Sequence, residues 1–247
     1  MQIIGIIPAR YQSSRFPGKV LADINGKSMV QRVYEQAGRS QKLSRLVVAT
    51  EDQRVVEHVE SFGGTAVLTG QQHASGTDRC YEALQQQAED YDYVINIQGD
   101  EPFIDPQQID DLAALLDGEV ELATLVKKIT TQDELFNWSE VKTVFNNKME
   151  ALYFSRQPIP YYRAAGELDW LQHQDYYKHI GIYAYRSDVL AAISRLPISP
   201  LEEAEALEQL RWLENGYRIK LAITEHESVC IDTREDLEKV LAMLGKA

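Results

Sequence analysis

Residues 93–102, with the sequence YVINIQGDEP, join a continuous apolar run directly to a polar loop. A short apolar run of this kind, bounded by turn residues, predicts a buried strand. Two earlier runs have the same character, QIIGII at 2–7, which Pro8 ends, and RLVVAT at 45–50. Strands that are apolar along their whole length are typical of a parallel sheet covered on both faces, so these segments decide the fold class.

The stretches between these strands place apolar residues at helical spacing. The pattern predicts helices over 28–37, 53–61, 77–89 and 106–116, and a short strand over 65–68. This alternation predicts an α/β fold with a mostly parallel sheet between helical layers. Ligands bind such sheets beyond the carboxyl ends of the strands, and the polar loops 8–19 and 98–103 both lie there.

The second half of the chain has a different pattern. Runs at 122–127, 141–146, 152–155 and 179–186 predict strands, several with hairpin-like connections, whereas 158–178 show no clear periodicity. We therefore expect a strand-rich sub-lobe over about 120–190 within a single domain of residues 1–247. The pattern then predicts a helix over 201–214, a strand over 217–223 and a helix over 233–244, capped by Asp232 or Thr233.

The net charge of −13 is unevenly distributed along the chain. Residues 1–47 hold eight Lys/Arg and two acids, a net of +6, which leaves −19 for the remainder. An acidic total argues against nucleic-acid binding through a general basic surface. No run approaches the roughly 20 apolar residues of a membrane span, and no signal-peptide pattern is visible. With two distant cysteines as well, we expect a cytoplasmic protein with reduced thiols.

The loop at 8–19 contains Arg10, Arg15 and Lys19 among small residues. Arginine presents forked donors that suit phosphate oxygens, and lysine adds a mobile point charge. The loop lacks the Walker pattern of a P-loop. Two interpretations stay open at this point, a triphosphate-binding loop and an ordinary solvated one.

Asp100 and Asp232 each follow an apolar strand, so both could reach the same edge of the sheet. Two carboxylates from distant segments, together with substrate oxygens, can build an octahedral Mg²⁺ site. The alternatives are a strand-ending turn for Asp100 and a helix N-cap for Asp232.

Three further groups could contact a ligand. The segment 75–79 opens a helix, so its backbone amides and Arg79 could receive an anion or a base edge. His179, Gly181 and Tyr183 are expected on one face of a strand, and Glu208, Gln209 and Arg211 on the helix 201–214. A helix cap, a structural histidine and a solvated helix face are the respective alternatives.

Seven segments together resemble the CMP-Kdo synthetase family (3-deoxy-manno-octulosonate cytidylyltransferases), and they run nearly end to end in the family's order and spacing. They are Ile7–Tyr11 with Ser14–Lys19, Ser75–Arg79, Asn96–Pro102, Ala151–Arg156, Lys178–Tyr183, Leu207–Arg211 and Asp232–Leu237. The resemblance implies a three-layer α/β/α nucleotide-diphospho-sugar transferase fold and a homodimer. It also implies the reaction CTP + Kdo → CMP-Kdo + pyrophosphate, in which Kdo is an acidic eight-carbon sugar. The product CMP-Kdo is used in the synthesis of the lipopolysaccharide inner core.

The same resemblance implies roles for matching positions. Arg10, Arg15 and Lys19 would bind the triphosphate, and Asp100 and Asp232 would ligate Mg²⁺. Cytidine would be surrounded by Pro8, Ser75, Gly76 and Gln98, and the sugar pocket would be lined by Arg79, Arg156, His179, Tyr183, Glu208 and Gln209.

The sequence departs from the family pattern near one proposed metal ligand. The family usually has Gly-Val/Ile-Asp-Thr-Pro, whereas this chain has Cys230-Ile231-Asp232-Thr233-Arg234. Val20 also stands where Pro is usual, a change that we interpret as neutral. The alternative substrates are 8-amino-Kdo and, for a more distant relative, sialic acid. The alternative classes of protein are a glycosyltransferase, for which the sequence lacks an Asp-x-Asp motif after the strand at 93–97, and a non-catalytic nucleotide-binding module.

Overall fold

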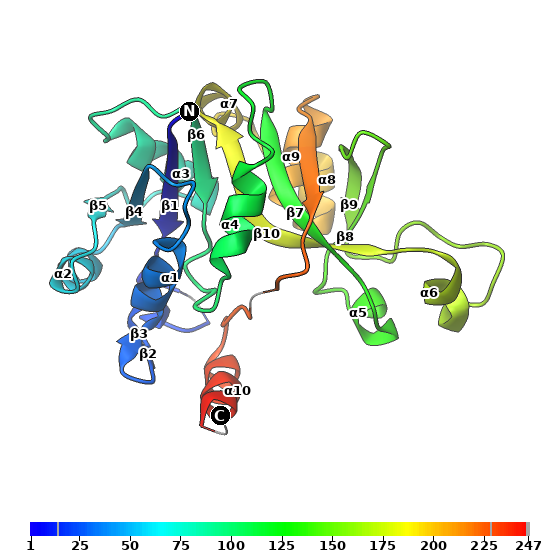
Figure 1. Ribbon diagram of the computed structural model, residues 1–247, viewed down its shortest axis with the longest axis horizontal. Helices are drawn as coiled ribbons and strands as arrows, with labels where there is room; N and C mark the ends of the chain where they lie inside the picture. The colour runs from blue at the N-terminus through cyan, green and yellow to red at the C-terminus, as the bar shows by residue number, and fades with distance from the viewer. Residues whose placement is uncertain (14, 228, 246–247) are drawn as a thin grey trace.

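A nine-stranded sheet forms the centre of the computed structural model, which describes residues 1–13, 15–227 and 229–245 (Figure 1). The strand order is β11-β7-β10-β6-β1-β4-β5, and β8 pairs with β10 and with β9. The strands are β1 (Ile3–Pro8), β4 (Arg45–Thr50), β5 (Ala66–Leu68), β6 (Tyr93–Asn96), β7 (Leu122–Lys128), β8 (Lys142–Phe145), β9 (Ala151–Ser155), β10 (Tyr177–Arg186) and β11 (Ile219–Ile223). A separate two-stranded sheet joins β2 (Asp23–Ile24) to β3 (Lys27–Ser28).

The central sheet is mostly parallel, as the sequence predicts. β1 is parallel to β4 and β6, β4 to β5, and β7 to β11, whereas β10 runs antiparallel to both β6 and β7. Pro8 pairs with Ala49, and Ile6 pairs with Asn96. The register therefore brings the carboxyl ends of β1, β4 and β6 to one edge, where the loops that follow them lie together.

Helices cover both faces of the sheet, because alternate strand residues point to opposite sides. Ile3 and Ile7 of β1 pack in one core with α1 (Met29–Ala37), α2 (Gln53–Ser61) and α4 (Pro106–Ala113). Ile4 and Ile6 pack in a second core with α3 (Gly76–Gln85), α7 (Ser187–Ile193) and α9 (Glu208–Glu214). The result is the predicted three-layer α/β/α arrangement.

Side-chain caps fix where the first helices begin. The side chains of Ser28, Asp52, Ser75 and Asp105 each accept a hydrogen bond from a backbone N–H in the first turn of the following helix. Such caps satisfy amide donors that have no partner within the helix. α3 consequently begins directly after Ser75, which places its N-terminus at the ligand-binding edge of the sheet.

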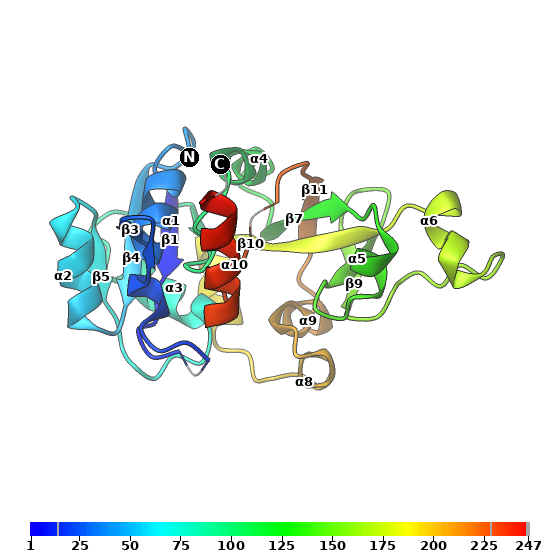
Figure 2. The same cartoon turned by 90° about the horizontal axis from the view of Figure 1, so that it is seen from below.

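The sub-lobe extends away from the main sheet (Figure 2). It contains β8, β9, the first part of β10, α5 (Gln132–Phe136), the 3₁₀ helix η2 (Glu167–Asp169) and α6 (Trp170–His173). A small core of Ile129, Leu135, Trp170 and Tyr176 holds it together. The strands expected between 120 and 190 are present, but β7 and the end of β10 belong to the main sheet.

The single helix expected over 201–214 is wrong, because two helices occupy that stretch. α8 (Pro200–Glu205) ends at Ala206, which has a left-handed backbone with φ of 51°. Leu207 is extended and buried, and α9 begins after it. The amphipathic spacing continues across the break, so periodicity alone does not reveal it.

The C-terminal helix α10 (Arg234–Leu244) packs against residues from the N-terminal part of the chain. Its Val240 packs with Ile24, Met29 and Ile231, and Thr233 is the N-cap. The 3₁₀ helix η1 (Lys19–Leu21) precedes β2. Within the described parts of the chain, each helix is too short or too polar to cross a membrane.

Candidate active site

A pocket of about 690 Å³ opens at the carboxyl ends of β1 and β6. The walls come from the cationic loop after β1, the loop after β6, the N-terminus of α3 and the segment before α10. Ser14 of the cationic loop lies outside the described residues. Nine of the residues singled out from the sequence line this pocket, namely Pro8, Arg10, Arg15, Lys19, Gly76, Arg79, Gln98, Asp100 and Asp232.

Asp100 and Asp232 meet at the floor of the pocket, although they are far apart in the sequence. Their carboxylate oxygens belong to a group of ligand atoms that all lie within 4.8 Å of one another. Lys19 Nζ lies between them, 2.9 Å from Asp100 Oδ2 and 3.1 Å from Asp232 Oδ1. Arg15 also reaches Asp232 Oδ1, at 3.1 Å. The predicted convergence of the cationic loop with two remote aspartates is therefore confirmed.

Lys19 stays a cation in this arrangement. Burial by itself lowers the pKa of the ammonium group, but the charges and hydrogen bonds of Asp100 and Asp232 outweigh that effect and raise the pKa above its ordinary value. The Lys19 side chain is only 10% exposed, so the attraction is little screened by solvent. The loop thus presents a fixed positive charge beside the two carboxylates.

The same two carboxylates suit a magnesium ion. Mg²⁺ prefers oxygen ligands and is commonly held by one or two carboxylates together with substrate phosphates. The third ligand-type atom near them is the Cys230 sulfur. Cys230 is exposed, and its sulfur is a soft ligand that a hard cation disfavours. Of the three groups, the two carboxylates are therefore the ones that suit a magnesium ion.

Glycine is required where the walls of the pocket come together. A Cβ at Gly99 would lie 2.6 Å from the backbone oxygen of Pro8, so a larger residue would push the two loops apart. Gly18 has φ of +73°, which other residues adopt at a cost, and its amide donates to Tyr11 O at 2.9 Å. These glycines let the cationic loop fold back over the sheet edge.

A second polar group lies next to the pocket, on the face of the sheet covered by α3 and α9. Tyr183 contacts the ring of His179 with centroids 5.1 Å apart, which confirms that the two side chains share a face of β10. Burial lowers the pKa of His179 to about 3, so its imidazole is neutral, and it raises the pKa of Tyr183 well above the ordinary value. The Tyr183 hydroxyl has no hydrogen-bond partner among the described residues.

Glu208 belongs to this second group. Its carboxylate accepts from Thr77 Oγ1 at 2.9 Å and interacts with Ser75, and burial raises its pKa. Gln209 beside it is buried. The Gln98 amide donates to Gly181 O at 2.9 Å, which links the pocket to the strand that carries His179 and Tyr183.

Arg156, which is predicted for the sugar pocket, is hydrogen-bonded to the protein backbone. Its guanidinium donates to the backbone oxygens of Glu205, Ala206 and Trp138 at 2.7, 3.2 and 3.3 Å. These bonds brace the turn between α8 and α9, because that turn leaves carbonyl groups without helical partners. Its contact with a sugar carboxylate stays a prediction.

Glu51 is a residue of this site that sequence reasoning missed. It follows β4 directly, and its Oε1 accepts from the backbone N–H of Tyr11 at 3.0 Å. Its Oε2 lies 3.1 Å from Arg79 Nη1. The rule that drew attention to Asp100, a carboxylate at the carboxyl end of a buried strand, applies equally to Glu51.

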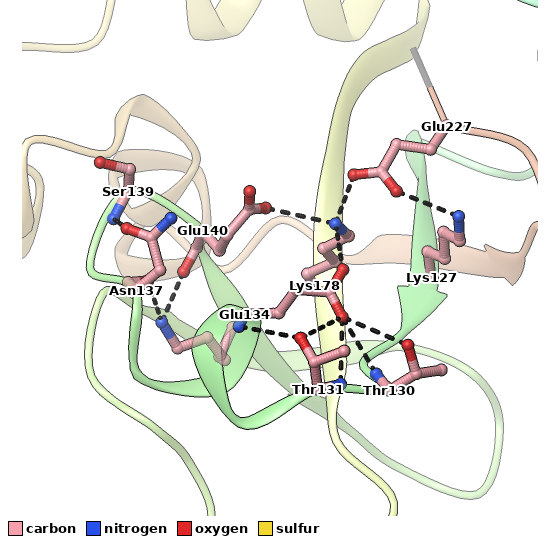
Figure 3. Close-up of polar contacts among 10 residues, drawn as sticks. Lys127, Thr130, Thr131, Glu134, Asn137, Ser139, Glu140, Lys178 and Glu227 are labelled. Atoms are coloured by element: carbon pink, nitrogen blue, oxygen red, sulfur yellow. Dashed lines mark hydrogen bonds and ion pairs between the residues drawn. The ribbon is translucent and has the colours of Figure 1, made fainter. Parts of the chain in front are cut away.

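The segment that leads from β11 to Asp232 is attached to the body of the protein by charged residues (Figure 3). Glu227 pairs with buried Lys178 and, at 3.0 Å, with Lys127. Lys178 also pairs with Glu134 at 2.8 Å, and Glu140 lies 3.6 Å away. Further along, the amide of Ile231 donates to Asp100 O at 2.9 Å. Both ends of the segment are thus fixed, which holds Asp232 in the lining of the pocket.

Comparisons with known proteins agree with this geometry. The family model described as cytidylyltransferase matches residues 4–221. A 3-deoxy-manno-octulosonate cytidylyltransferase from Parabacteroides distasonis is 55% identical over 99% of both chains. An 8-amino-3,8-dideoxy-manno-octulosonate cytidylyltransferase from Shewanella baltica is 48% identical over 97% of both. A solved CMP:2-keto-3-deoxy-manno-octonic acid synthetase complexed with CTP superposes with a TM-score of 0.92 at 43% identity, covering 100% of this chain and 99% of that one.

The similarity extends along nearly the whole chain. The match to the family model spans well over half of the sequence, and the relatives are covered nearly completely. The chain belongs to the cytidylyltransferase family.

Proposed function

We propose that this protein transfers the cytidylyl group of CTP to the C2 hydroxyl of Kdo and releases pyrophosphate. The observation that carries the proposal is the meeting of Asp100, Asp232 and Lys19 at the floor of one pocket. The near-identical fold of a synthetase complexed with CTP, and the relatives named for Kdo transfer, support this choice of substrates. The activated sugar would supply the lipopolysaccharide inner core, and we expect the reaction in the cytoplasm.

In this proposal, different walls of the pocket contact the triphosphate and the base of the nucleotide. Arg10, Arg15 and Lys19 face the triphosphate, where their charges stabilise the negative charge that develops on the leaving pyrophosphate. Pro8 and Gly76 form a close-packed wall, because a Cβ added at Gly76 would lie only 3.3 Å from the Pro8 ring. Such a wall suits a flat base. The Gln98 side chain extends toward the second polar group and marks the boundary between base and sugar.

Asp100 and Asp232 would hold Mg²⁺ against the phosphates. When bound, the ion would neutralise charge on the α-phosphate and lower the pKa of the attacking hydroxyl. The two aspartates come from distant parts of the chain, and the hydrogen bond from the amide of Ile231 to Asp100 O holds their segments together. Lys19 contacts both carboxylates and would stabilise the transferring phosphate from the same side.

The second polar group would bind the sugar. The neutral imidazole of His179, the unpaired hydroxyl of Tyr183 and the carboxylate of Glu208 offer donors and acceptors to a polyhydroxylated ligand. Arg79 lines the wall between the two groups and could reach the carboxylate of the sugar or a phosphate. Buried polar groups of this kind strongly reject analogues that leave them unpaired.

The substrate is tested by measuring pyrophosphate release with CTP and Mg²⁺ against Kdo, 8-amino-Kdo and sialic acid. We expect the highest kcat/KM with Kdo. The kcat/KM with sialic acid should be lower by about 100-fold or more, because its extra substituents would disturb the contacts of the second polar group. A kcat/KM higher with 8-amino-Kdo than with Kdo would show that 8-amino-Kdo is the preferred substrate. Failure to release pyrophosphate with any of the three would exclude the proposed reaction.

We also propose that the protein is a homodimer that uses the sub-lobe as its interface. Phe136 and Tyr161 surround Trp170 with ring centroids 5.9 and 5.0 Å away, yet Tyr161 is 71% exposed and nearby Leu168 is 78% exposed. An exposed apolar patch of this kind is typical of an interaction surface.

Light scattering tests the dimer. The unaltered protein should have twice the chain mass of 28.1 kDa, and Leu168→Asp should shift it toward the mass of one chain. Met243→Asp is the matched control, because Met243 is similarly exposed but lies on α10, outside the sub-lobe. A single-chain mass for the unaltered protein at micromolar concentration would refute the dimer.

A further inference from the structure

A buried ion pair connects the two walls of the pocket. Glu51 follows β4, and its side chain is only 8% exposed. Its Oε1 accepts from the backbone amides of Tyr11 and Gln12, at 3.0 and 3.4 Å, and so holds the cationic loop. Its Oε2 lies 3.1 Å from Arg79 Nη1 on α3. One carboxylate therefore contacts two segments that are separated by more than sixty residues in the sequence.

Arg79 is oriented by three neighbours, all through the same nitrogen. Nη1 donates to Thr69 Oγ1 at 2.6 Å and to Gly70 O at 3.3 Å. Its contact with Glu51 Oε2 is an ion pair without a hydrogen bond. The side chain is 1% exposed, and its other terminal nitrogen, Nη2, has no hydrogen-bond partner among the described residues. Buried guanidinium donors are normally paired, so a free one beside a pocket indicates a donor reserved for a ligand. Because Arg79 lines the pocket, an oxyanion bound there is the ligand that this donor would serve.

The charge of Glu51 is what allows two arginines to lie near each other. Burial lowers the pKa of Arg79, the attraction of Glu51 opposes that effect, and Arg10 lowers the pKa further by repulsion. An arginine buried without a counter-ion is strongly disfavoured. Without Glu51, Arg79 would turn toward solvent or move away from Arg10, and the wall that it forms would change.

We propose that Glu51 is a positioning residue for nucleotide binding. It holds the backbone of the cationic loop with one oxygen and pairs with Arg79 through the other, so that Arg10 and Arg79 are held together at the wall of the pocket where the triphosphate of CTP would bind. Glu51 itself does not line the pocket. The inference rests on the proposed function in one respect, the identity of the bound anion as CTP.

The test is Glu51→Gln in the full-length protein. The amide oxygen of glutamine can still accept from Tyr11, so the loop keeps its anchor while Arg79 loses its counter-ion. We expect CTP affinity, measured by calorimetry with Mg²⁺, to fall by about 10- to 100-fold, because small misplacements of binding groups have effects of this size. The KM for CTP should rise by a similar factor, and the KM for Kdo should change less than threefold.

Glu57→Gln is the matched control. It removes the same charge from the neighbouring helix α2, where Glu57 is exposed and accepts only from Gln53, at 3.4 Å, among the described residues. CTP affinity should be unchanged in this variant. If Glu51→Gln unfolds the protein, the double variant Glu51→Gln/Arg79→Gln leaves no buried charge unpaired, and it should regain the fold while CTP binding stays weak.

The outcomes separate the two proposals. CTP affinity within twofold of the unaltered protein in folded Glu51→Gln would overturn the positioning role, as would an effect confined to the KM for Kdo. If the double variant folds and binds CTP normally, the positioning role also fails. If the unaltered protein binds no CTP, the proposed function fails instead.

Discussion

Replacing Asp100 or Asp232 by Asn should reduce turnover by about 10³-fold or more, because each change removes an anionic ligand worth several kcal/mol at the transition state. The side chains would keep their shape and their hydrogen-bonding oxygen. The Lys19 ammonium group contacts both carboxylates, so either single variant leaves it with one charged partner. We therefore expect both variants to fold. Pyrophosphate release at varied Mg²⁺ concentration checks the rate, and circular dichroism checks the fold.

Asp111→Asn provides the control for the loss of one negative charge. Asp111 lies on α4 and accepts from Gln107 at 2.7 Å, away from the pocket. Its replacement should leave both turnover and the Mg²⁺ dependence unchanged. Near-normal turnover of Asp100→Asn and Asp232→Asn at limiting Mg²⁺ would show that these carboxylates do not hold the metal.

Lys19→Met should lower kcat/KM for CTP by about 10²- to 10³-fold, the range typical for removal of one preorganised donor from a charged transition state. It should also leave two neighbouring carboxylates without their ammonium group. Their repulsion destabilises the folded protein, and a bound cation relieves it. We therefore expect Mg²⁺ alone to raise the melting temperature of Lys19→Met by more than that of the unaltered protein, which differential scanning calorimetry can measure.

Arg15→Ala gives a graded comparison at the same site. Arg15 is 64% exposed and contacts only Asp232 among the described acidic residues, so its effect on kcat/KM for CTP should be smaller, about tenfold. A KM and kcat for CTP equal to those of the unaltered protein in both variants would remove the cationic loop from the mechanism. Equal losses in the two variants would contradict the ranking by burial.

The features that sequence reasoning predicts best are those fixed by short-range rules. The strand over 45–50 and the helix over 53–61 are predicted to the residue, because an uninterrupted apolar run and a side-chain cap mark them. The convergence of Asp100 with Asp232 follows from the parallel sheet, which brings the ends of its strands to one edge. Most of the pocket could thus be assembled from strand ends alone.

The parts that were missed depend on contacts between distant segments. The break at Ala206 has no glycine or proline to mark it, and the packing of Leu207 sets it. Arg156 resembles a free cation in the sequence, but its donors meet three backbone oxygens, from Trp138, Glu205 and Ala206, that only the folded chain brings together. The strand-end rule could have singled out Glu51, but its contacts with Tyr11 and Arg79 depend on the fold, because no spacing rule connects those three positions.

The order of synthesis gives the docking of Asp232 a further consequence. The last strand of the sheet, β11, ends at Ile223, so every sheet partner leaves the ribosome before Asp232 does. A nascent chain that has reached this strand could already enclose a nucleotide with Arg10, Lys19 and Asp100. It would lack the carboxylate of Asp232 until the segment that follows β11 had bound beside Asp100. Competence for the reaction would therefore arrive in one late step, after the sheet has formed.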